Sequence, residues 1–421
     1  SSLPGVRRWL VVDDGSAEPA PGFATPFESL AEAGNGAPLG IERSPRDLFF
    51  VYTGGTTGMP KGVMWTHDAM RRALLTPALV ERMPEALADH LQMVRETGKG
   101  PITLPACPLM HGTGLMSGIS ALVNGGTVIT LRSAHFDANE MWDAVERHRA
   151  DQLIIVGDAF AKPMLRALDE SPARRDLSCV LAIISSGTMW SMEVKQAMLR
   201  YMQQATLLDS FGSSEAVGFG LSAMTADGAV QTAKFQLGDD VKVFAHDGRE
   251  VAPGSGEVGI IGRCGAIPEG YYKDPAKTEA TFRTIGGVRY AMPGDYCTVE
   301  ADGTITLLGR GRGCINTAGE KVFPEEVEEV LKQHPDVEDA LVVGLADDKW
   351  GQAVTAVVEL RRGADFDEEA LRQHVRGQLA GYKTPKRVVA VERMFRAPNG
   401  KADYKGARQF AEQALQRQTA G

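Results

Sequence analysis

The hydrophobic pattern between residues 48 and 312 alternates between short apolar runs and helical periodicity. Apolar runs rich in β-branched and aromatic residues predict strands at Leu48–Thr53, Gln152–Val156, Cys179–Ser185 and Thr206–Asp209. Apolar positions at helical spacing predict helices between them, at Asn139–Arg149 and Met192–Gln203. Short buried strands separated by helices are typical of an α/β fold, so we expect a large domain of mixed, largely parallel sheets.

Turn signals become frequent after residue 227 and predict a smaller β subdomain. The pattern contains Asp227-Gly228, Asp247-Gly248 and Pro253-Gly254-Ser255-Gly256. Such pairs connect antiparallel strands, so this stretch is expected to form hairpins.

The pattern of apolar positions changes again after Gly309–Gly313. Glycines at alternate positions of this segment favour a hinge. Pro324 is expected to open a helix whose first turn is acidic, as the helix dipole favours. The pattern then predicts strands at Ala340–Val343 and Val354–Leu360 and a helix through Leu371, Val375 and Leu379. We therefore expect a large domain over residues 1–311 and a small, mobile α+β domain over residues 312–421.

Composition and charge narrow the class of protein without naming it. The 421 residues are 43% hydrophobic and carry a net charge of −9, with no long basic tract, which argues against nucleic acid as a partner. Five scattered cysteines without a CxxC pair argue against a disulfide framework and a zinc site, and they favour the reducing cytoplasm. No apolar run is long enough for a transmembrane segment.

The start of the chain predicts that it begins inside a larger protein. Its first residue is Ser1, no signal-peptide pattern follows, and a strand-like segment, Trp9–Val12, comes almost at once.

The most informative segment is a loop rich in glycine and threonine, from Tyr52 to Gly62. Four glycines allow close backbone approach, three threonines supply hydroxyl groups, and one lysine supplies a positive charge, a combination that suits a polyphosphate. The loop does not match the Walker pattern, because Gly62 follows the lysine where Ser or Thr is required. Taken alone, it could also be a flexible surface loop.

This loop resembles the signature of the adenylate-forming superfamily, which includes acyl-CoA synthetases, adenylation domains and beetle luciferases. The resemblance implies that ATP phosphates contact Thr53, Gly54, Gly55, Thr56, Thr57, Gly58 and Lys61, with Thr57 also a catalytic residue and a Mg²⁺ ligand.

A second motif of that family is similar to the segment Asp209–Glu215. By resemblance, Glu215 is a catalytic residue that holds Mg²⁺ against ATP, and the nucleotide contacts Asp209, Ser210, Phe211, Gly212, Ser213 and Ser214. A carboxylate beside a glycine-rich turn is a suitable ligand for a hard cation. The competing interpretation is that Ser213 or Ser214 caps a helix beginning near Glu215.

Further nucleotide contacts follow from the same resemblance. Ser185, Ser186 and Gly187, at the end of an apolar strand, would line the adenine pocket. Asp295 would bind both ribose hydroxyls, as a carboxylate can, although Pro293 stands where the family usually has Thr. Arg310 would contact the ribose or a phosphate. The expected hinge pivot is Arg312, a position where the family commonly has Asp or Lys.

The resemblance also implies catalytic and coenzyme A contacts. Lys401, in Ala397-Pro398-Asn399-Gly400-Lys401, would be the lysine that neutralises charge between the substrate carboxylate and the α-phosphate. His111 matches a position at the acyl pocket entrance, although a single histidine after an apolar strand is more often structural. Gly319 and Lys321 would line the pantetheine tunnel.

Together these motifs, in family order over the whole chain, imply an AMP-forming acyl-CoA synthetase that uses ATP, Mg²⁺, CoA and a small-molecule carboxylic acid. The stretch ending at Trp65 looks like bacterial fatty-acid and sterol-side-chain CoA ligases. Gly218 and Gly220 would leave room for a bulky acyl group, or they reflect tight backbone packing. Two alternatives stay open: an adenylation domain that loads a carrier protein, and a non-catalytic nucleotide-binding protein. Family members have a longer portion before the phosphate loop, so we expect part of the large domain to be absent.

Overall fold

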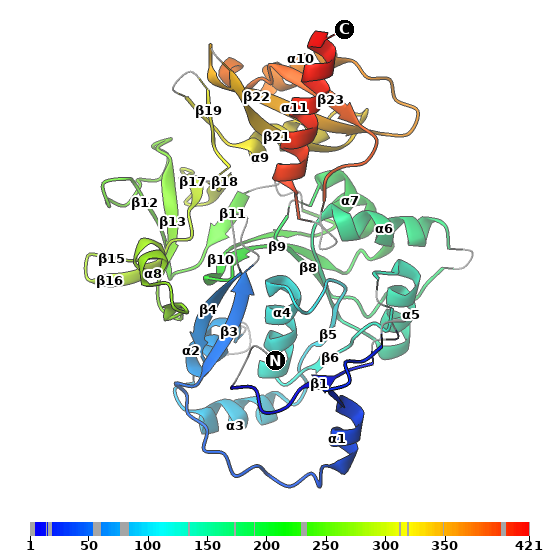
Figure 1. Ribbon diagram of the computed structural model, residues 1–421, viewed down its shortest axis with the longest axis vertical. Helices are drawn as coiled ribbons and strands as arrows, with labels where there is room; N and C mark the ends of the chain where they lie inside the picture. The colour runs from blue at the N-terminus through cyan, green and yellow to red at the C-terminus, as the bar shows by residue number, and fades with distance from the viewer. Residues whose placement is uncertain are drawn as a thin grey trace. The chain divides into compact units, whose positions relative to one another are not determined.

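The N-terminal residues form a unit of their own in the computed structural model (Figure 1). The structure describes residues 5–420 except 14, 16–18, 54–59, 76–83, 134, 172–173, 189, 229–233, 311–312, 318–319, 348 and 397–400, and it describes only the backbone of Arg310, Lys321 and residues 418–420. The chain divides into Ser1–Pro45 and Arg46–Gly421. In the first unit, β1 (Leu10–Val11) pairs in parallel with β2 (Thr25–Pro26), and α1 (Phe27–Ala33) follows.

The second unit is built on a large mixed sheet, of 13 strands among the described residues. Its parallel half has the order β6-β5-β7-β8-β9. These strands are β5 (Ile102–Pro105), β6 (Thr127–Val128), β7 (Gln152–Ile155), β8 (Ala182–Ser186) and β9 (Thr206–Ser213). Because side-by-side parallel strands carry their carboxyl ends to one edge, the ends of β8 and β9 meet there.

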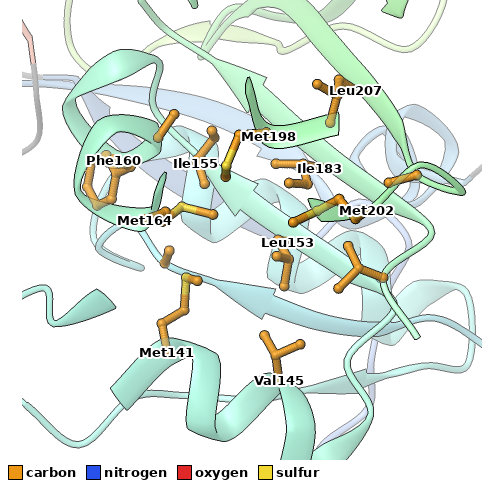
Figure 2. Packing of buried hydrophobic residues seen from close by; sticks show 14 of the residues in the cluster. Met141, Val145, Leu153, Ile155, Phe160, Met164, Ile183, Met198, Met202 and Leu207 are labelled. Carbon is orange, nitrogen blue, oxygen red and sulfur yellow. The ribbon is translucent and has the colours of Figure 1, made fainter. Parts of the chain in front are cut away.

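Three helices cover one face of this parallel half: α5 (Ala138–His148), α6 (Asp158–Asp169) and α7 (Met192–Tyr201). Figure 2 shows how Met141, Phe160 and Met198 from these helices pack against Leu153, Ile155 and Ile183 of the strands. The carboxylate of Asp137 caps α5 by accepting from the backbone N–H groups of Asn139 and Glu140. The predicted helices are therefore confirmed, with ends within two residues of the expected ones.

The predicted β subdomain is confirmed as the antiparallel half of the same sheet. Its strands are β10 (Ala216–Met224), β11 (Lys234–Leu237), β12 (Val241–Phe244), β13 (Gly259–Arg263), β15 (Phe282–Ile285), β16 (Val288–Ala291), β17 (Asp295–Val299) and β18 (Ile305–Arg310). A second core, in which the ring of Phe211 contacts those of Phe219 and Phe235, packs against this half.

A separate three-stranded sheet carries the phosphate loop. Its order is β14-β4-β3, with β3 (Leu48–Thr53), β4 (Lys61–Thr66) and β14 (Gly270–Tyr271). The strands β3 and β4 are antiparallel, and Thr53 is opposite Lys61. The predicted loop is therefore shorter than Tyr52–Gly62, because both of its ends continue the strands. Nearby helices are α2 (His67–Leu74), α3 (Leu87–Thr97), α4 (Gly112–Val123) and α8 (Pro275–Thr281).

The C-terminal residues form the predicted α+β arrangement, with the strand order β20-β19-β22-β21 and β23 beside β22. Its elements are β19 (Ile315–Thr317), β20 (Glu320–Val322), α9 (Pro324–Lys332), β21 (Val337–Asp347), β22 (Gly351–Leu360), α10 (Glu368–Gln378), the 3-10 turn Gly381–Lys383, β23 (Arg387–Val391) and α11 (Tyr404–Ala420). The expected helix start at Pro324 is confirmed. The domain boundary at 311/312 stays a prediction, and the hinge residues Gly311 and Arg312 lie outside the described residues. Among the described helices, none is long and apolar enough to cross a membrane.

Candidate functional site

The strands β3 and β4, which flank the predicted phosphate loop, contribute their adjoining ends to the site. Thr53 ends β3 and Lys61 begins β4, and the ammonium group of Lys61 pairs with the carboxylate of Asp274. The predicted phosphate contacts Gly54, Gly55, Thr56, Thr57 and Gly58 lie outside the described residues.

The predicted magnesium motif, Asp209–Glu215, is a β-hairpin. Ser213 ends β9, Ala216 begins β10, and Ser214 and Glu215 form the turn between them. The alternative of a helix capped by Ser213 or Ser214 is wrong, because antiparallel pairing of Ser213 with Ala216 leaves no room for a helical turn. The Ser213 hydroxyl instead accepts from the backbone N–H of Glu215 at 3.2 Å.

Asp209, at the start of this motif, is held by a buried lysine. The ammonium of Lys195, on α7, pairs with the Asp209 carboxylate. Burial raises the pKa of Asp209, and the charge and hydrogen bond of Lys195 oppose that rise. The pair therefore fixes the end of the strand that carries Ser210–Ser214.

The predicted adenine contacts lie beside this motif. Ser185 and Ser186, on β8, are opposite Asp209 and Ser210 in the parallel register of β8 and β9. The buried Ser185 hydroxyl accepts from the backbone N–H of Gly157 at 2.9 Å, so it also anchors the start of α6. Gly187 follows at the strand end and lines a cavity that Ser185 and Ser186 also line.

Asp295 lies on a neighbouring pair of strands. It begins β17, is only 4% exposed, and is opposite Arg310 on β18. The two predicted ribose contacts therefore occupy facing backbone positions. Lys321, the predicted pantetheine contact, is on β20, and Gly319 lies outside the described residues.

His111 and Lys401 approach each other from opposite ends of the chain. His111 is the N-cap residue of α4, and Lys401 precedes α11. Partial burial, and then the positive charge of Lys401, lower the pKa of His111. The imidazole is therefore neutral at pH 7, and the ammonium group of Lys401 lies within electrostatic reach of it.

One cavity of about 2280 Å³ gathers these groups. Its lining includes all predicted site residues whose side chains the structure describes: Thr53, Lys61, His111, Ser185, Ser186, Gly187, Asp209, Ser210, Phe211, Gly212, Ser213, Ser214, Glu215, Asp295 and Lys401. An apolar part is lined by Leu74, Leu75, Met116 and Phe235. The residues predicted to bind a polyphosphate and an apolar region therefore share one space.

The two glycines after Glu215 have different explanations. A Cβ on Gly220 would lie 2.8 Å from the carbonyl oxygen of Gln236, so backbone packing requires glycine there. Gly218 lines the cavity, and its φ of +72° favours glycine whatever the space around it. Tight backbone packing therefore accounts for Gly220, whereas room for an acyl group at Gly218 stays a prediction.

The metal-ligand side chains available in the cavity suit a metal ion that is already bound to a nucleotide. Among the described residues, no three His, Cys, Asp or Glu side chains converge as a metal site. Glu215 lies in the cavity lining, and among the described residues it belongs to no such cluster. Mg²⁺ is commonly bound by one or two carboxylates together with substrate phosphates, so Glu215 suits Mg²⁺ carried by a nucleotide.

A buried cysteine in the lining is unsuited to covalent catalysis. Burial raises the pKa of Cys107 to about 12, and burial together with the charge of Asp295 raises that of Cys297 to about 12. Both thiols are protonated at neutral pH, whereas the thiolate is the nucleophile.

Three contributors to the site were not predicted from the sequence: Lys195, Tyr271 and Asp274. The Tyr271 hydroxyl donates to Glu215 Oε1 at 2.5 Å. A sequence signal existed for Asp274, since Asp before Pro275 is a typical helix start, and Asp274 does cap α8. Its pairing with Lys61 could not be read from local pattern.

Two protein-family models match the chain, one in its N-terminal part and one in its C-terminal part. The family model described as AMP-binding enzyme matches residues 7–272. The model of the AMP-binding enzyme C-terminal domain matches residues 326–401.

Several curated proteins are similar over nearly the whole chain. A medium/long-chain-fatty-acid–CoA/3-oxocholest-4-en-26-oate–CoA ligase from Mycolicibacterium smegmatis is 40% identical over 97% of this chain and 75% of its own length. A 3-oxocholest-4-en-26-oate–CoA ligase from Rhodococcus rhodochrous is 40% identical over 97% of this chain and 74% of its own length. Among solved structures, ATP-bound MatB from Rhodopseudomonas palustris has a TM-score of 0.72 at 25% identity, covering 91% of this chain and 72% of that chain.

Proposed function

The chain belongs to the family of AMP-binding enzymes, and from this premise we propose that it is an AMP-forming acyl-CoA ligase. The observation that carries the proposal is the single cavity in which Glu215, Asp295 and Lys401 meet. In such an enzyme a carboxylate attacks the α-phosphate of ATP to give acyl-AMP and pyrophosphate. The thiol of CoA then displaces AMP.

In the first step, different residues of the cavity bind the different parts of ATP and stabilise the reacting groups. Ser185–Gly187 bind the adenine, Asp295 and Arg310 the ribose, and Thr53–Gly58 with Lys61 the phosphates. Glu215 and Thr57 would hold Mg²⁺, which neutralises phosphate charge when bound. Lys401 stabilises the charge that develops between the carboxylate and the α-phosphate. His111, neutral because of burial and Lys401, lies where the acyl group enters.

The second step requires positioning of CoA and no covalent enzyme intermediate. The protonated thiol of Cys107 supports direct transfer from acyl-AMP to CoA. We propose that residues 312–421 rotate at about Arg312 between the two steps, with Gly319 and Lys321 along the pantetheine path. The odd number and scattered spacing of the cysteines are the ground for also proposing a cytoplasmic location.

We propose a hydrophobic carboxylic acid, either a medium- or long-chain fatty acid or a sterol side-chain acid, as the acyl substrate. The apolar lining formed by Leu74, Leu75, Met116 and Phe235 supports such a group. The names of the two relatives that share 40% identity point to the same substrate class.

A panel of carboxylic acids tests the function. We expect CoA-dependent AMP release with medium- and long-chain fatty acids and with 3-oxocholest-4-en-26-oate, and little release with acetate, because the apolar lining favours large hydrophobic groups. The assay is AMP release, with the acyl-CoA product identified by mass spectrometry. Acid-dependent pyrophosphate exchange without any acyl-CoA product would instead favour the carrier-loading alternative. Tight ATP binding without activity towards any acid would favour a non-catalytic protein.

Asp295→Asn is expected to raise the KM for ATP roughly 10- to 100-fold, because hydrogen bonds to a charged acceptor are worth about 1.5–3 kcal/mol. The KM for the carboxylic acid should change little. The measurement is steady-state kinetics with each substrate varied in turn. Asp302→Asn, in the exposed turn at the other end of the β17–β18 hairpin, is the matched control. An unchanged KM for ATP would contradict the ribose assignment.

A further inference from the structure

The short strand β14 is fixed to the strand that leaves the phosphate loop. Gly270 and Tyr271 pair with Met64 and Val63 of β4. The backbone N–H of Tyr272 also donates to the carbonyl of Gly62 at 2.8 Å. A Cβ on Gly270, whose φ is +147°, would lie 2.4 Å from the Thr278 side chain, so glycine is required where β14 meets α8. The position of Tyr271 is therefore set by its backbone.

The side chain of Tyr271 is equally constrained. It is 4% exposed, with its ring edge-to-face to Phe282 at 6.0 Å and the Lys277 ammonium 5.7 Å from the ring centre. Its hydroxyl donates to Glu215 Oε1 at 2.5 Å. Hydrogen bonds from hydroxyl groups to carboxylates at such distances are short and strong. Tyr271 therefore orients the Glu215 carboxylate.

The backbone around Glu215 is held from the same small sheet. The indole N–H of Trp65, a fully buried residue of β4, donates to the carbonyl of Ser214 at 3.0 Å. Asp274, just beyond β14, pairs with Lys61. The segment Tyr271–Asp274 thus contacts both a predicted metal ligand and a predicted phosphate ligand.

We propose that Tyr271 is a positioning residue for the magnesium ion that accompanies ATP, an inference that rests on the proposed function. By holding Oε1 of Glu215, the hydroxyl fixes the orientation in which the carboxylate would meet Mg²⁺. Loss of such an outer-shell partner typically lowers metal affinity or activity by about 10- to 100-fold. Tyr271 itself does not touch the substrate.

The test is Tyr271→Phe, which keeps the ring and removes only the hydroxyl group. We expect the Mg²⁺ concentration for half-maximal ATP binding, measured by calorimetry in a magnesium series, to rise about 10-fold or more. ATP affinity without Mg²⁺ should stay unchanged. In a Glu215→Gln background, where the anionic ligand is already lost, Tyr271→Phe should not raise the magnesium requirement further. Tyr201→Phe, at an exposed residue outside the cavity lining whose hydroxyl also donates to a carboxylate, that of Asp169, is the matched control.

Several outcomes would overturn the inference. One is a Tyr271→Phe protein with an unchanged magnesium requirement, and another is one with equal losses of ATP affinity with and without Mg²⁺. A further loss in the Glu215→Gln background would show that the tyrosine acts through packing. Because binding needs no acyl substrate, an unaltered protein that binds Mg·ATP but activates no acid would remove the proposed function and leave this test intact. An unaltered protein whose ATP binding ignores Mg²⁺ would overturn the role of Tyr271.

Discussion

Replacing Lys401 with alanine is expected to abolish acyl-AMP formation while largely sparing thioester formation from supplied acyl-AMP. Removing one preorganised charged or donor group at a developing charge typically costs about 10²–10³ in rate. Lys401 is well placed for this role, because its charge reaches His111 and it lines the cavity with Glu215. ATP–pyrophosphate exchange measures the first half-reaction, and acyl-CoA formation from synthetic acyl-AMP measures the second.

Residues on both sides of Lys401 are held by contacts of their own, so replacing Lys401 with alanine should not disturb the fold. Arg396 forms two hydrogen bonds with Asp339, at 2.5 and 2.8 Å, and Arg396 is bridged to Ala402. Lys99→Ala, at an exposed lysine outside the cavity lining, serves as the control. Equal losses in both half-reactions would contradict the assignment of Lys401 to the first step alone.

Glu215→Gln is expected to lower the rate of acyl-AMP formation by about 10² or more. A bound metal ion supplies several kcal/mol of charge stabilisation in the transition state, and about 1.4 kcal/mol corresponds to a factor of ten. Glutamine can still accept from Tyr271, so the turn should keep its shape while the anionic ligand is lost. Pyrophosphate exchange at a series of Mg²⁺ concentrations measures the effect.

A second glutamate of the same neighbourhood provides the comparison for Glu215→Gln. Glu269 is exposed, adjoins β14, and lies outside the cavity lining, so Glu269→Gln should leave exchange unchanged. If Glu215→Gln lost activity only at low Mg²⁺ and regained the full rate at high Mg²⁺, Glu215 would contribute to metal affinity alone. Full activity at all concentrations would exclude Glu215 as a metal ligand.

The parallel half of the large sheet could be predicted from sequence because its inner strands β5 and β7 are buried on both faces. Such strands read as continuous apolar runs, and the predicted strand beginning at Gln152 differs from β7 by one residue. The hairpin at Glu215 was harder, because Gly212, Ser213 and Ser214 resemble a loop or a helix cap. Pairing between β9 and β10 overrides that local preference, and pairing is a tertiary effect.

The site residues that the resemblance supplied and whose side chains the structure describes line one cavity, whereas their supporting contacts could not be predicted. Tyr271 reaches Glu215 across 56 residues of sequence, and Asp274 reaches Lys61 across 213. Neither pair lies within one helix or one strand, so no periodicity relates its members. Such contacts follow only from the packing of β14 on β4.

The facing positions of Thr53 and Lys61 also determine which side of β4 each of its side chains occupies. Alternate residues of a strand point to the same face, so Lys61 and Trp65 share one side of β4. On that side, Lys61 lies at the start of the strand, and the indole N–H of Trp65 donates to the carbonyl of Ser214. A slip of one residue in the pairing of β3 and β4 would turn both side chains to the opposite face. The register of this hairpin therefore sets the placement of Lys61 and of the Trp65 contact with the Ser214 turn together.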